Sequence, residues 1–62
     1  MSLNLKPNID DPDGFYEKLI TLQRNLSDDE VLLLNARLVL VLANHIGDAR
    51  VLEEAMRIAS GE

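Results

Sequence analysis

The residues of this sequence whose types and spacing come closest to a chemical site are the acidic side chains near its N-terminus. Asp11, Asp13 and Gly14 have the spacing of the third, fifth and sixth positions of a calcium-binding loop, in which carboxylate oxygens are the ligands. The rest of that pattern is missing, because Ile9 stands at the first ligand position and Ile20 at the twelfth. We therefore interpret Asp11 as the N-cap of a helix that begins one residue later, and not as a metal ligand.

A second candidate site is the pair His45 and Asp48, which stand three residues apart with Gly47 between them. A histidine close to a carboxylate could bind a metal ion or act as a general base. The structural alternative is that His45 interacts with the dipole at the end of one helix, Gly47 ends that helix, and Asp48 caps the next one. We favour the structural alternative.

Asn35 is a polar residue among apolar ones. At about 100° per residue its side chain points into an apolar sector of a helix, and a buried amide needs a hydrogen-bond partner. It could fix the register of an assembly, as a buried asparagine does in coiled coils, or it could bond a turn of the N-terminal segment. Both roles remain open, and we predict that Asn35 and His45 are structural residues that pair with backbone or with a neighbouring chain.

The sequence lacks the other groups that catalysis and cofactor binding usually need. It has no cysteine and one histidine, which excludes a thiolate zinc site and a multi-histidine site within one chain. It has no nucleophile beside a base and no glycine-rich phosphate loop. We predict a protein that is not an enzyme and that holds no cofactor and no metal ion.

The charge of the chain limits its partners. The net charge is -5, from 11 acidic and 6 basic residues, and this field repels a phosphate backbone, so we expect no nucleic-acid binding. The longest apolar run, residues 38–43, is far shorter than the roughly 18 to 20 residues of a membrane-spanning helix, so we expect no membrane span. The N-terminus lacks the features of a signal peptide, and we expect a cytoplasmic location.

The elements that carry these residues are predicted to be three helices of one small all-α domain over residues 1–62. Residues 1–10 are expected to form an extended arm that places Leu3, Leu5 and Ile9 against a helical surface. The helices are expected near residues 12–25, 28–46 and 49–59. The second helix has the clearest start, because Ser27 and Glu30 have the spacing of a capping box.

The predicted second helix is apolar on almost every side. One sector, wide enough to pack the other two helices, contains Val31, Leu38, Val39, Leu42 and Ile46. The opposite side contains the residues that we predict to form an interface: Leu33, Leu40, Val41, Arg37 and Asn44. A helix that is apolar nearly all round is a buried helix, and two short neighbours cannot surround it. The pattern therefore predicts a homodimer joined through the second helix, or another protein partner in the place of the second copy.

Two sequence blocks, LNLKPNIDDPDGFYEKLI and LNARLVLVLANHIGD, are similar to those of a family of short bacterial proteins, about 60 to 70 residues long, whose function is unknown. The blocks extend from Leu3 to Asp48. Members of that family are often encoded near flavin-dependent monooxygenases and hydrolases of aromatic-compound breakdown. The resemblance thus implies, at most, an accessory subunit of such an enzyme system, and it supplies no catalytic or binding residues.

Three functions are compatible with the sequence. The first is a non-catalytic interaction module, which acts as a homodimer or as an accessory subunit, and we favour it because of the excess apolar surface. The second is a small-ligand-binding or regulatory protein with a pocket between helices around Asn35, Asn44 and His45. The third is an enzyme that is active only as a dimer, in which the His45 side chains of two chains come together.

Overall fold

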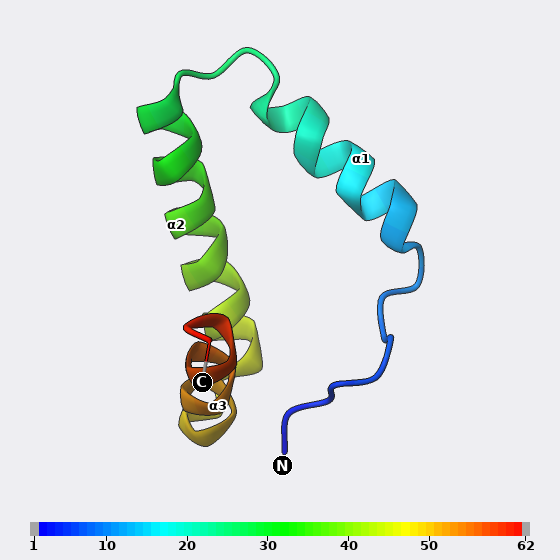
Figure 1. Cartoon of the computed structure of the whole chain (residues 1–62), viewed down its shortest axis with the longest axis vertical. Coiled ribbons are helices and arrows are strands. Elements are labelled where there is room, and N and C mark those ends of the chain that lie inside the picture. Colours follow the sequence, from blue (N-terminus) through cyan, green and yellow to red (C-terminus); the bar gives the residue numbers. More distant parts are fainter. Residues whose placement is uncertain (1, 62) are drawn as a thin grey trace.

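The structure, a computed structural model, describes residues 2–61, and these residues form three α-helices and no strand (Figure 1). Helix α1 spans Pro12–Gln23, α2 spans Asp28–Ile46 and α3 spans Ala49–Ala59. The all-α class is confirmed, and the observed helix bounds match the expected ranges except that α1 ends two residues before residue 25. Met1 of the predicted arm and Glu62 at the end of the predicted domain lie outside the described residues.

The early end of α1 results from a tightening of its last turn. The backbone N–H of Arg24 bonds the carbonyl of Thr21 at 3.3 Å, and that of Leu26 bonds the carbonyl of Gln23 at 3.1 Å. Hydrogen bonds to the third residue back replace the α-helical pattern there, as is common at helix ends. The chain therefore turns through residues 24–27 before α2 begins.

Each helix begins at a side chain that accepts hydrogen bonds from free backbone N–H groups. Asp11 Oδ1 accepts from Gly14 N at 3.1 Å, and Asp48 Oδ1 accepts from Arg50 N at 2.9 Å. At α2 both bonds of the capping box are present: Glu30 N donates to Ser27 Oγ at 3.3 Å, and Ser27 N donates to Glu30 Oε1 at 3.0 Å. A cap of this kind contributes about 1 kcal/mol to stability.

Gly47 sets the position of α3 relative to α2. Its φ of 72° lies in the left-handed region that glycine adopts without strain, and its N–H bonds the carbonyl of Ala43 at 2.9 Å, which ends α2. Asp48 then caps α3 immediately, so α3 packs beside the C-terminal end of α2 (Figure 1).

The three helices together form an open hook. α1 leaves the N-terminal end of α2 and diverges from it, while α3 lies at the other end (Figure 1). The radius of gyration is 13.3 Å, whereas a compact domain of this length has a value of about 11 Å. Among residues 2–61 only Val51, which is 5% exposed, is fully buried. The single chain therefore has almost no hydrophobic core.

Because the hook is open, two expectations from the sequence are not met, one for the packing of α2 and one for the N-terminal arm. In the sector of α2 that was expected to pack the other helices, only Val31 and Leu38 are half-buried, and Val39, Leu42 and Ile46 are exposed. The reason is that α1 and α3 approach opposite ends of α2 and leave its inner side open. In the arm Leu3 is half-buried, but Leu5 and Ile9 are exposed, so this arm does not cover a helix with all three side chains.

Candidate functional site: an open apolar surface

The predicted interface residues all lie on the surface of α2. Leu33, Leu40 and Val41 are 50%, 70% and 65% exposed, and the polar residues predicted beside them, Arg37 and Asn44, are exposed as well. Isolated apolar side chains on a surface are ordinary, whereas larger exposed apolar patches are common at interaction sites. The α2 surface is therefore the first part of the candidate site.

A groove between α2 and α3 is the second part. It has a volume of about 440 Å³ and is lined by apolar residues: Val39, Leu40, Leu42, Ala43, Ile46, Leu52, Ala55, Met56 and Ala59. The sequence reasoning placed no site here. The signal was the strong amphipathic pattern of α3, whose apolar face is more than its contact with α2 covers, as the 62% exposure of Met56 shows.

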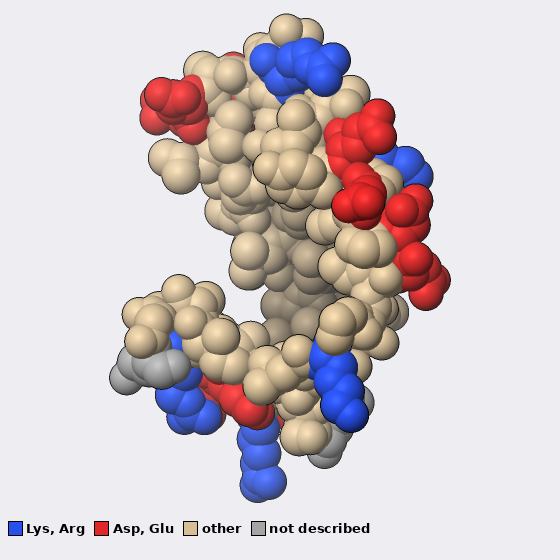
Figure 2. Space-filling model, turned by 45° about the vertical axis from the view of Figure 1, so that its right-hand side comes forward, with Lys and Arg blue, Asp and Glu red and all other residues tan. Residues whose placement is uncertain are grey.

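Charged groups lie mainly outside this apolar region. Figure 2 shows a hollow in the molecule walled by uncharged side chains, with acidic and basic groups along the outer surfaces. Protein interfaces commonly have this arrangement, in which a polar rim surrounds an apolar centre.

The total exposed surface is larger than that of a compact monomer. The chain exposes 5752 Å², whereas a compact monomer of its mass, 6.9 kDa, exposes about 4,000 Å². The excess agrees with the exposed apolar side chains on all three helices and with the shape of the hook. A partner chain, or a closure of the hook, would reduce this excess of exposed area.

The polar residues of interest are placed differently from a catalytic cluster. Asn35 is exposed in the single chain, and its Oδ1 accepts a hydrogen bond from Gln23 Nε2 at 3.1 Å, so it links α2 to α1 and does not bond the arm. The sequence reasoning missed this partner, because Gln23 and Asn35 lie on different helices. His45 is exposed in the last turn of α2.

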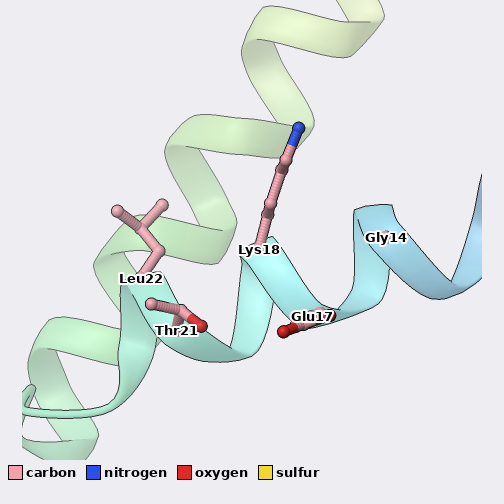
Figure 3. Close-up of a pocket in the computed structure, with 5 residues that line it drawn as sticks. All are labelled: Gly14, Glu17, Lys18, Thr21 and Leu22. Atoms are coloured by element: carbon pink, nitrogen blue, oxygen red, sulfur yellow. The ribbon is translucent and has the colours of Figure 1, made fainter.

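None of Asn35, Asn44 and His45 lines the groove between α2 and α3. A second hollow lies on the surface of α1 and is lined by Gly14, Glu17, Lys18, Thr21 and Leu22 (Figure 3). In this hollow the Lys18 side chain extends away from that of Glu17 (Figure 3). These two groups do not converge on one point, which general acid–base chemistry requires.

Within residues 2–61, no three acidic, histidine or cysteine side chains gather closely enough to hold a metal ion. No helix in this part of the chain combines the length and the apolar composition that crossing a bilayer requires.

The geometry defines a class: a small all-α protein with open apolar faces on its central and C-terminal helices. The chain belongs to the family DUF2783, described as a protein of unknown function, whose model matches residues 3–61. This membership agrees with the resemblance to a family of unknown function that the two sequence blocks indicated. No curated protein and no solved structure matches the chain.

Proposed function

We propose that this chain is a non-catalytic interaction module that binds another protein chain through the apolar surface of α2 and the adjoining groove. The observation that carries the proposal is the exposed area of 5752 Å², well above the roughly 4,000 Å² expected of a compact monomer of this mass. Much of that surface is made of large apolar side chains that a partner would remove from water.

The energy of such a contact is large for so small a chain. Burying one exposed leucine such as Leu40 contributes roughly 1.5 to 3 kcal/mol, whereas a complete domain is stable by only about 5 to 15 kcal/mol. A chain of 62 residues without a disulfide commonly gains its missing stability from oligomerisation. Binding and folding are thus expected to support each other in this protein.

The partner is either a second copy or a larger protein. The family resemblance adds one form of the second case, an accessory subunit of a flavin-dependent enzyme system for aromatic compounds. Under this proposal the chain supplies contact surface and no catalytic group. In support, His45, Glu17 and Lys18 are exposed side chains, and none of them lies in the apolar groove.

The proposal is tested by placing a photoreactive phenylalanine analogue at Leu40 and irradiating host cells that produce this variant. Leu40 is 70% exposed and belongs both to the α2 surface and to the lining of the groove. A second variant carries the analogue at Arg57, which is exposed on the polar side of α3. We expect a covalent adduct with a protein chain at Leu40 and little at Arg57. If Leu40 gives no more adduct than Arg57, the interaction module is the wrong function.

A further inference from the structure

The groove between α2 and α3 has an apolar lining over two turns of each helix. On α2 its residues run from Val39 to Ile46, and on α3 they run from Leu52 to Ala59. Each stretch advances by seven residues, which is about 10 Å along a helix axis. Because the lining side chains are apolar, the groove offers area for contact but no hydrogen-bonding group that would orient a polar ligand. Its shape and chemistry suit an amphipathic helix that lays its apolar face in the groove.

The α1 helix of the same chain does not occupy this groove. It is joined to the far end of α2 and diverges from it (Figure 1), and the hydrogen bond from Gln23 to Asn35 links its C-terminal end to the first half of α2. The groove begins at Val39, about 16 Å further along α2 than Asp28 at 1.5 Å per residue. In this structure α1 and the groove of the same chain are therefore apart.

The same helix nevertheless has the pattern that the groove requires. Phe15, Leu19 and Leu22 recur at spacings of four and three, and the stretch from Phe15 to Leu22 also advances by seven residues. Phe15 and Leu22 are 46% and 61% exposed, so the apolar face of α1 is itself incompletely covered. The opposite side of α1 carries Glu17, which would stay in water.

We propose that the groove between α2 and α3 is occupied by α1 of a second copy of this chain, in a reciprocal homodimer. Among the helices of residues 2–61, α2 and α3 already form the walls of the groove, so α1 is the helix left to enter it. With a two-fold axis, the α1 helix of each copy lies in the groove of the other copy. The groove and the apolar face of α1 are then both covered. This inference rests on the proposed function and names the partner.

The exposed area supports a pairing of this extent. Two separate chains expose 5752 Å² each, and a compact protein of twice the mass exposes about 6,600 Å². Full association would then bury roughly 5,000 Å² in total, which lies at the upper end of the range for obligate homodimers. A smaller contact through Leu33 and Val41 alone would leave the groove and the face of α1 in water.

The test uses the absence of native cysteine. A chain with Phe15→Cys or Leu22→Cys is mixed with a chain of different mass that has Met56→Cys, and the mixture is treated with a short bis-maleimide. The control replaces Met56→Cys with Arg57→Cys, the next residue on α3, which points about 100° away from Met56. We expect the mixed cross-linked product with Met56→Cys and its loss with Arg57→Cys.

A second measurement avoids any substitution. Phe15 is the one phenylalanine of the chain and Met56 is one of two methionines. In a mixture of unlabelled chains with chains that are deuterated except for 13C-labelled methionine methyl groups, a nuclear Overhauser effect from the labelled Met56 methyl to ring protons of Phe15 or Tyr16 reports a contact between copies, because the labelled chains carry no ring protons. We expect this signal in the mixture and its absence in a sample of the labelled chains alone.

The outcomes separate this inference from the proposed function. If neither cross-link nor Overhauser effect appears in a chain that sediments as a dimer, α1 does not fill the groove, and the interaction module stands. A wild-type chain that sediments as a folded monomer, or Leu40 adducts formed with other proteins and none with a second copy, also overturn the proposed homodimer. Failure of the Leu40 adduct altogether removes the function on which the inference depends.

Discussion

At the start of α1, the Asp11 side chain restricts which residue can stand at position 14. The Asp11 carboxylate accepts the Gly14 N–H at 3.1 Å, and a β-carbon at residue 14 would collide with Asp11 Oδ2. Alanine in place of a helical glycine normally stabilises a helix by about 1 kcal/mol, and loss of an aspartate cap costs about the same. The two effects are therefore coupled through the space between these residues.

This coupling leads to a prediction for four chains measured by urea denaturation at one protein concentration. Gly14→Ala should change the free energy of unfolding little by itself, because the added methyl group displaces the Asp11 cap. In an Asp11→Ala background the same Gly14→Ala change should stabilise the protein by about 1 kcal/mol. Equal effects of Gly14→Ala in both backgrounds would show that the collision does not occur in solution.

The hydrogen-bond partner of Asn35 could not be predicted from the sequence alone. The helical period placed it in an apolar sector and required a partner, but the partner depends on how far α1 closes on α2. In the structure that partner is Gln23, and Asn35 remains exposed. A pattern along one helix specifies a direction, whereas the atom that it meets depends on a second element.

At the scale of elements, helix starts and ends were predictable because their causes are local. Ser27 and Glu30 are three residues apart, and Gly47 precedes Asp48, so the bonds that delimit α2 and α3 form between close neighbours in the sequence. The packing of Val39, Leu42 and Ile46 was not predictable in this way, because it depends on the angle between helices. The α2–α3 groove was missed for the same reason.

The start of α2 also predicts a dependence of stability on pH. The hydrogen bond from the Ser27 backbone, followed by that from its side chain, lowers the pKa of Glu30 below its ordinary value. A carboxylate whose pKa is lower in the folded state contributes stability above its unfolded pKa and loses that contribution as the pH falls through the folded pKa. Acidification through this window should therefore weaken the start of α2.

Glu30→Gln is the matched test of this dependence, because glutamine can also accept the Ser27 N–H in a capping box but does not titrate. Melting temperatures measured from neutral to acidic pH should fall less steeply for Glu30→Gln than for the wild type. Other carboxylates titrate in both proteins and cancel in the comparison. Parallel curves for the two proteins would contradict a stabilising role for the Glu30 carboxylate.

At the scale of the whole molecule, the position of the exposed apolar side chains, more than their total area, decides whether one chain can cover them. α2 is exposed on two sides: Leu42 and Ile46 line the groove with α3, and Leu33 and Val41 lie on the outer side, with Leu40 at the border between the two. Closure of the hook by its own α1 could cover the inner side of a single chain. It could not also cover the outer side, since α1 and α3 are 12 and 11 residues long and each has one apolar face. A monomer closed in this way would thus keep Leu33 and Val41 in water.

The double substitution Leu33→Lys and Leu40→Lys therefore tests whether the outer side of α2 is covered in the assembled protein. Each lysine would place a charge in a dry contact, where an unpaired charge is far more costly than the apolar contact it removes. We expect the variant to sediment as a monomer at micromolar concentration and to melt at a lower temperature than the wild type.

The control, Asn8→Lys with Asn25→Lys, adds the same two charges at exposed polar residues and should keep the wild-type mass and melting temperature. If both pairs of substitutions leave a dimer intact, neither Leu33 on the outer side of α2 nor Leu40 at the edge of the groove lies in the contact between copies, which contradicts this prediction. If both dissociate it, the added charge is the cause and the apolar contact is not.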